Sequence, residues 1–127
     1  MEQKKYELED RFTDLISGVL GIVDALPDSS SGNYLGEKLV KTVFATSSRY
    51  NNDVQKARSR TEFIQQMWEV LKELKESRTI LKIISVREMV KPASKLEKIS
   101  DETEHLIAII GKSISTAKKN KTKTAAA

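Results

Sequence analysis

Residues 59–84 read SRTEFIQQMWEVLKELKESRTILKII, about seven helical turns without Gly, Pro or Cys. Ser59 with Glu62 three residues later forms a capping box, which is a start signal for a helix. The residues that follow at steps of four and three form one heptad seam. They are Phe63, Met67, Val70, Leu74, Ser77, Leu81 and Ile84. We therefore predict a long amphipathic helix over residues 60–86 that packs lengthwise against other helices.

Three further segments carry the same apolar spacing and are predicted to be helices. The first covers about residues 3–26 and ends before Pro27, because proline disfavours a helical conformation in the residue that precedes it. The second covers about 34–57, with a possible break near Asn51 and Asn52, where polar side chains compete for backbone hydrogen bonds. The fourth covers about 92–118 and starts at Pro92, which suits a first helical turn.

Four such helices joined by short connections predict an all-α fold, an antiparallel up-and-down four-helix bundle. The bundle is expected to be one domain of residues 1–118, followed by a disordered basic tail at 119–127. Several large apolar residues lie off the seams and predict a second buried surface between copies of the chain. The predicted oligomer interface consists of Ile16, Leu20, Trp68, Ile80 and Ile83.

Composition restricts the setting of the protein. There are no cysteines, which removes disulfides and thiolate chemistry and fits a reducing compartment. The charged start MEQKKYELEDRF does not resemble a targeting peptide, and no apolar run approaches the roughly 18 residues of a membrane span. We expect a soluble, cytoplasmic protein.

The net charge of +4 is unevenly distributed along the chain. Residues 1–28 carry three basic and seven acidic groups, whereas residues 112–127 carry five lysines and no acid. A basic end of this kind can bind phosphates or an acidic protein, or can simply keep the chain in solution.

Two basic clusters make nucleic acid the leading partner, through contacts that do not depend on base sequence. Tyr50 lies between Arg49 and two asparagines and is a candidate for stacking on a base. The candidate nucleic-acid-binding residues are Lys38, Lys41, Arg49, Tyr50, Lys56, Arg58, Arg60, Lys112, Lys118 and Lys119. The alternative is a scaffold that docks another protein and does not itself bind nucleic acid.

The sequence offers little for catalysis or metal binding. Glu102 and His105 have the Glu-x-x-His spacing of di-iron bundles, but that chemistry needs two such motifs and the chain has one histidine. No serine lies in a Gly-rich elbow, and Gly18 and Gly21 fall inside a helix, where close helix packing explains them. We expect no enzyme activity, no metal and no cofactor.

Four stretches resemble a known family: LGEKLVKTVFATSSRYNNDV at 35–54, SRTEFIQQM at 59–67, EVLKELKESRTILKII at 69–84 and DETEHLIAIIGKSISTAKKN at 101–120. They are similar to the four-helix-bundle proteins encoded in intervening sequences of bacterial 23S ribosomal RNA genes. The chain departs from the family at ATSSRYNNDVQKA, residues 45–57, where Arg49 and Tyr50 replace small or apolar residues.

The resemblance implies a ring-shaped homopentamer without enzyme activity. A related branch, the accessory variability proteins of diversity-generating retroelements, binds a reverse transcriptase and nucleic acid through basic surfaces. The resemblance therefore implies a bacterial accessory factor whose partners are itself, RNA or DNA, and a reverse transcriptase.

Overall fold

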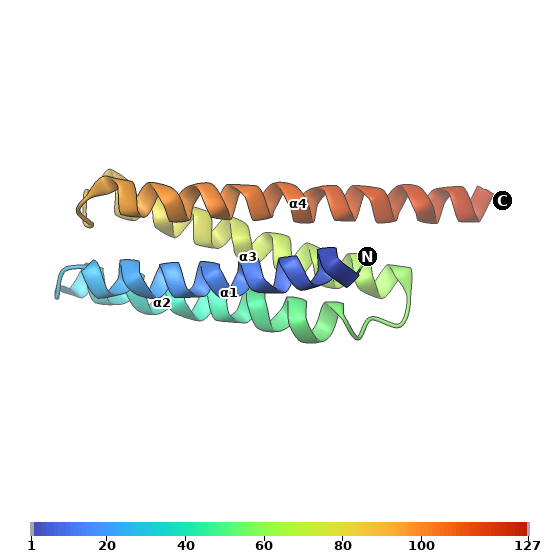
Figure 1. Ribbon diagram of the computed structural model, residues 1–127, viewed down its shortest axis with the longest axis horizontal. Coiled ribbons are helices and arrows are strands. Elements are labelled where there is room, and N and C mark those ends of the chain that lie inside the picture. Colours follow the sequence, from blue (N-terminus) through green and yellow to red (C-terminus); the bar gives the residue numbers. More distant parts are fainter. Residues whose placement is uncertain (1, 127) are drawn as a thin grey trace.

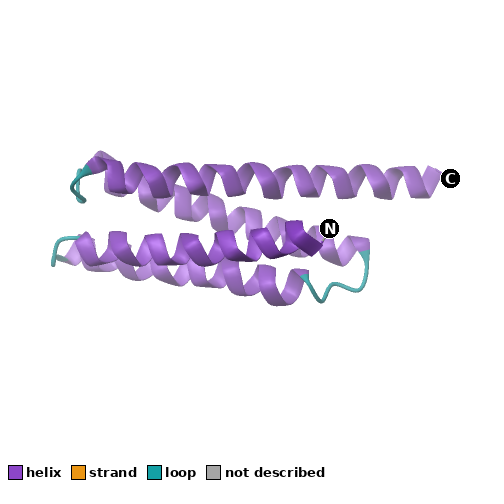
Figure 2. Cartoon of the chain, in the orientation of Figure 1, coloured by secondary structure: helices purple, strands orange, loops and turns teal. Residues whose placement is uncertain are grey.

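The computed structural model describes the backbone of residues 2–126 and the side chains of residues 8–120. The backbone forms α1 (Glu2–Ala25), α2 (Ser30–Ser48), a short π-helical segment η1 (Arg49–Val54), α3 (Arg60–Val86) and α4 (Ala93–Ala126). Within residues 2–126 every element is helical, and only short loops join them (Figure 2). The predicted all-α class is confirmed.

The helices run alternately up and down, and each packs beside the next along the chain (Figure 1). The start of α1, the connection between η1 and α3, and the last turns of α4 lie at one end of the bundle, which we call the terminal end. The opposite end, the turn end, holds the α1–α2 and α3–α4 connections. The last turns of α4 extend past the other helices. This is the predicted antiparallel up-and-down arrangement.

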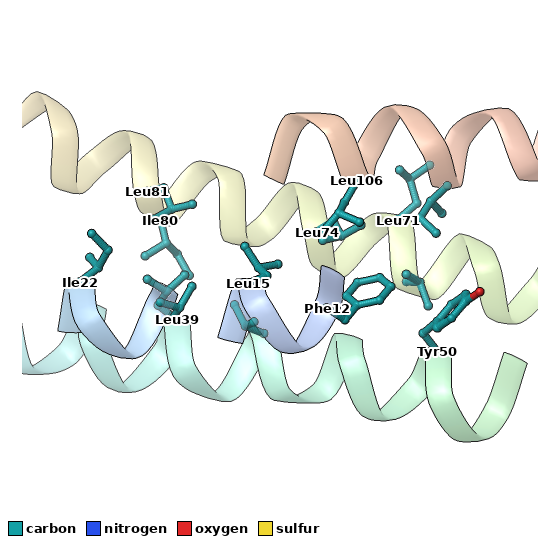
Figure 3. Packing of buried hydrophobic residues seen from close by; sticks show 14 of the residues in the cluster. Phe12, Leu15, Ile22, Leu39, Tyr50, Leu71, Leu74, Ile80, Leu81 and Leu106 are labelled. Atoms are coloured by element: carbon teal, nitrogen blue, oxygen red, sulfur yellow. The ribbon is translucent and has the colours of Figure 1, made fainter. Parts of the chain in front are cut away.

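The predicted seam of α3 forms the centre of the core. Of its members, Met67, Leu74 and Leu81 are at most 1% exposed, and Phe63 is half-buried. Residues from the other helices meet this seam in one continuous apolar cluster. Figure 3 shows Leu15, Leu39 and Leu106 pointing into it from α1, α2 and α4.

The bounds of α3 are those predicted, but α2 begins four residues earlier than expected. Ser29 has an extended backbone, and its side-chain oxygen accepts a hydrogen bond from the Gly32 backbone N–H at 3.1 Å. This N-cap satisfies one of the unpaired donors of the first turn, so residues 30–33 join the helix instead of the loop. The α-helix was expected to continue to about residue 57, but α2 ends at Ser48 and the polar stretch at 49–54 forms η1. Tyr50 and Val54 of η1 are nevertheless buried.

The last helix also departs from the prediction. The sequence predicts a disordered tail from residue 119, whereas α4 continues to Ala126, and Ala127 lies outside the described residues. Lysine and alanine are good helix formers, and adding a residue to an existing helix costs far less than starting one. The tail therefore extends α4 as helical turns.

Gly18 is used for helix packing, as predicted. A Cβ at Gly18 would overlap the Ile99 side chain, so the glycine allows α4 to approach α1 closely. Between α1 and α2 the same purpose is served by Gly36, where a Cβ would lie 3.2 Å from Val23 Cγ1 and from Leu26 Cδ1. These close approaches fix how far α1 can slide along its two neighbours.

Candidate nucleic-acid interface

The up-and-down topology brings the two predicted basic clusters to the same end of the molecule. Lys56, Arg58 and Arg60 are exposed on the η1–α3 connection and the first turn of α3, at the terminal end. Lys118 and Lys119 are exposed in the last third of α4, which runs toward that same end (Figure 1), and Lys112 is exposed nearly two turns before them. We call these six residues the basic end. Among the side chains described, the ion pairs of the bundle do not include Lys56, Arg58, Lys112 or Lys119.

Arg49 was predicted to bind nucleic acid, but it is occupied inside the protein. Its guanidinium donates to Glu73 Oε1 at 3.0 Å and to Gln66 Oε1 at 3.2 Å, and it lies 3.6 Å from Asp53 Oδ2. The hydrogen bond to the Glu73 carboxylate raises the pKa of Arg49 above its ordinary value. Arg49 therefore joins η1 to α3, and a phosphate at the predicted position would have to compete with Glu73 for its guanidinium.

Tyr50, which was predicted to stack on a base, is buried in this structure. Tyr50 is 6% exposed, and its ring centroid lies 5.2 Å from that of Phe12 (Figure 3). Burial raises the pKa of its hydroxyl above the ordinary value. Tyr50 continues the spacing of Leu39, Val43 and Thr46 by steps of four and three, and these residues form the buried side of α2.

Lys38 and Lys41 do not belong to the basic end. Both are exposed on α2 at a distance from its η1 end, and Lys38 Nζ lies 3.4 Å from Glu76 Oε1 on α3. With 45% and 46% of the two side chains exposed, this ion pair contributes little to stability. It nevertheless lowers the positive charge that this part of α2 presents.

The five residues predicted for the oligomer interface do not share one surface. Ile80 is 4% exposed and belongs to the core, because its side chain faces α2 and is covered within the single chain. Ile83 lies near the turn end of α3, and Trp68 lies on α3 nearer the terminal end. These three residues are therefore separated from Ile16 and Leu20 on α1.

Ile16 and Leu20 instead border two apolar residues of α2. The contacts of Gly36 with Val23 and of Phe12 with Tyr50 set the antiparallel register of α1 and α2. This register places Leu20 opposite Val40 and Ile16 opposite Phe44 on the outer side of the helix pair. We call Ile16, Leu20, Val40 and Phe44 the α1–α2 stripe, in which Leu20 is 42% and Phe44 49% exposed. Phe44 was not among the predicted interface residues, although it is large, apolar and off the seam.

A further exposed aromatic group, Trp68, lies beside the basic end. The Lys118 ammonium is 4.9 Å from the centroid of a Trp68 ring, a cation–π contact that joins α3 to α4. Trp68 is nevertheless 46% exposed. It is thus an accessible aromatic surface beside a cation, which is the environment predicted for Tyr50.

The acidic residues around His105 are used in ion pairs between helices. Arg11 Nε donates to Glu102 Oε1 at 2.9 Å, and Arg78 donates to Glu104 Oε1 at 3.3 Å. Among the described residues, no group of three His, Cys, Asp or Glu side chains is placed to hold a metal ion. A search of the same residues found no helix with the length and apolar character of a membrane span.

Comparison with known proteins supports the fold. The chain is similar to the crystal structure, at 1.70 Å resolution, of a protein of unknown function from the S23 ribosomal protein family of Bacteroides thetaiotaomicron VPI-5482. The TM-score is 0.77 at 15% sequence identity, over 88% of this chain and 98% of that one. No family model matches the sequence, and no curated protein matches it. At this identity the similarity shows a shared helical-bundle fold.

Proposed function

We propose that the protein is a non-enzymatic accessory factor that binds RNA or DNA through the basic end, as a homo-oligomer. The observation that carries the proposal is the meeting of two cation clusters, far apart in the sequence, at one end of the bundle. Phosphate contacts of lysine and arginine release condensed counterions, and their contributions add. Repetition of the basic end in an oligomer would strengthen binding further by avidity.

The family and the cellular setting belong to the same proposal. The sequence resemblance and the shared bundle fold both support a distant relationship to the bacterial proteins of 23S ribosomal RNA intervening sequences. On this proposal the protein acts in the bacterial cytoplasm as a ring, with five subunits as the expected number. A reverse transcriptase would be its protein partner if it belongs to the retroelement branch.

The proposal predicts tight binding at low salt and steep release as salt rises. A fluorescently labelled RNA or DNA oligonucleotide of about 20 nucleotides should bind at 50 mM salt, and the observed affinity should fall by orders of magnitude at 200 mM. Replacing Lys56→Glu, Arg58→Glu and Lys119→Glu together should abolish this binding, because the three side chains are exposed and take no part in the ion pairs among the described side chains. Fluorescence anisotropy measures both effects.

A matched control carries the same change of charge at the turn end. It combines Lys82→Glu, Arg87→Glu and Lys91→Glu, three exposed positions on and after the last turns of α3. The control should retain nearly all of the affinity, and circular dichroism should show both variants helical. Equal losses in the two variants would mean that net charge alone attracts the oligonucleotide, and the basic end would not be the site.

A second candidate function is a protein-docking scaffold, which the exposed α1–α2 stripe supports. Leu20 and Phe44 form an apolar surface that a partner protein can cover. Docking of this kind depends weakly on salt. An absence of oligonucleotide binding at 50 mM salt would favour the scaffold over the nucleic-acid-binding factor.

A further inference from the structure

Trp68 lies where α3 and α4 meet and offers a partly open indole to solvent. Lys118 approaches the ring to 4.9 Å, while 46% of the residue remains exposed. At this exposure nearly half of the residue's surface is still in contact with water. That exposed part of the indole is available to a ligand.

Among the described side chains, Lys118 is the cation that contacts this indole. Lys75 lies two turns after Trp68 on the same side of α3. On α4, Gly111 lies two turns before Lys118 on the same side, while Lys112 and Lys119 lie on the adjoining, outward side. We call this surface the Trp68 face: Trp68, Lys75, Gly111 and Lys118, with Lys112 and Lys119 at its edge. A Cβ built on Gly111 would meet nothing within 4 Å, so the face is open at that point.

The acidic residues of α3 lie on a different side of the helix. Glu62, Glu69, Glu73 and Glu76 follow one another at steps of seven, four and three. This line faces α2, because Glu73 bonds Arg49 and Glu76 pairs with Lys38. On α4 the sequence has no acidic residue after Glu104. Glu104 lies on the line of Gly111 and Lys118, two turns before Gly111, and it is paired with Arg78. Among the described residues, the Trp68 face is therefore aromatic and positively charged.

We propose that the Trp68 face binds single-stranded nucleic acid, with one base stacked on the Trp68 indole and Lys118 contacting an adjacent phosphate. This inference rests on the proposed nucleic-acid-binding function. It adds that the ligand is a single strand and that Trp68 distinguishes a single strand from a duplex. In the free protein, Lys118 covers part of the ring through the cation–π contact. On binding, the ammonium moves to a phosphate and a base takes its place on the ring.

The preference for single strands follows from the geometry of stacking. The bases of a duplex are stacked on one another and paired, so an indole on the outside of a helical bundle cannot reach their faces. An unpaired base presents a π-face whatever its identity, which makes such stacking tolerant of sequence. The lysines of the face then follow the phosphates of the same strand.

The first test uses Trp68 as its own reporter, because it is the single tryptophan of the chain. Titration of the protein with an oligothymidylate of about 12 nucleotides at 50 mM salt should quench the tryptophan fluorescence to saturation. An equal length of duplex should leave the fluorescence nearly unchanged. Binding without any quenching would overturn the stacking.

The second test measures the contribution of the ring by anisotropy of a labelled oligothymidylate. Trp68→Ala should weaken binding by about 5- to 150-fold, the range expected for loss of one stacked base. Trp68→Phe should recover part of that loss because it keeps an aromatic face. The matched control is Tyr34→Ala, which removes a 63% exposed aromatic side chain near the turn end and should leave the affinity unchanged.

The outcomes separate this inference from the function on which it rests. If Trp68→Ala binds as tightly as the unaltered protein while the charge reversal at the basic end abolishes binding, stacking is overturned and the proposed function stands. If neither oligothymidylate nor duplex binds at 50 mM salt, the proposed function fails as well. If dilution of the protein alone changes the Trp68 emission, the indole lies between copies of the chain, and the single-strand site is overturned.

Discussion

At the scale of single residues, the neighbours Arg49 and Tyr50 both have partners inside the protein, which their polar surroundings in the sequence do not indicate. Both lie in η1, where the sequence is polar and the two side chains look available to a ligand. The structure instead directs the Arg49 guanidinium to Glu73 and packs the Tyr50 ring on Phe12. The buried stripe predicted the position of Tyr50 correctly. The partner of Arg49 lies 24 residues away on another helix, and no local pattern identifies it.

Burial of Tyr50 makes stability depend on alkaline pH. Its pKa is raised in the folded protein above the ordinary value of about 10, so the folded state holds the proton more tightly than the unfolded chain. Its contribution to stability is complete below about pH 10 and is lost as pH rises through the folded pKa. Tyr50→Phe cannot ionise, so its free energy of unfolding should fall less between pH 9 and 11. Urea titrations of both proteins measure this difference, and parallel pH curves would contradict it.

At the scale of elements, the long helices follow from the sequence, and their ends depend on caps. The uninterrupted heptad seam gave the bounds of α3 correctly, because its start has a capping box and its interior has no competing signal. The start of α2 was placed four residues late because three serines precede Gly32, and only the backbone shows which of them caps. The end of α4 lies beyond its apolar seam, because polar residues can extend an existing helix. The apolar spacing therefore could not predict where α4 ends.

The end of α3 offers a test of cap energetics. Met89 N–H bonds Ile84 O at 3.1 Å and Glu88 N–H bonds Ser85 O at 3.0 Å, which is the Schellman arrangement. Glu88 occupies the left-handed position of this motif with φ 50°, where glycine is favoured. Glu88→Gly should therefore raise the free energy of unfolding by about 1 kcal/mol. Urea denaturation measures the change, with Glu88→Ala as the control that keeps a Cβ and should give no gain.

At the scale of the whole molecule, the surface divides into sides of different character. The α1–α2 stripe is apolar, the α2-facing line of α3 carries carboxylates, and the basic end joins the tip of α4 to the start of α3. The sequence predicted the excess of apolar area correctly, yet it assigned that area to one interface. Separate faces become visible only when the register between helices is known, and close contacts such as that at Gly36 set this register.

We predict that copies of the chain associate through the α1–α2 stripe. Two substitutions in the stripe should then give a monomer. Leu20→Glu with Phe44→Glu would place two carboxylates in the apolar contact, and burying unpaired charges is costly. Light scattering should give a multiple of the 14.3 kDa chain mass for the unaltered protein and 14.3 kDa for the variant. Tyr34→Glu with Val86→Glu is the control, since those residues are exposed elsewhere and the mass should stay that of the oligomer. A 14.3 kDa mass for the unaltered protein at every concentration would remove the stripe from this role.

The up-and-down path of the chain also decides where the protein can be labelled. The start of α1 and the end of α4 share the terminal end, so a fusion at either would stand beside the lysines of the basic end (Figure 1). Pro27, Asp28 and Ser29 form an exposed turn at the opposite end. A fluorophore or surface tether attached at Asp28 would leave both the Trp68 face and the basic end open to an incoming strand.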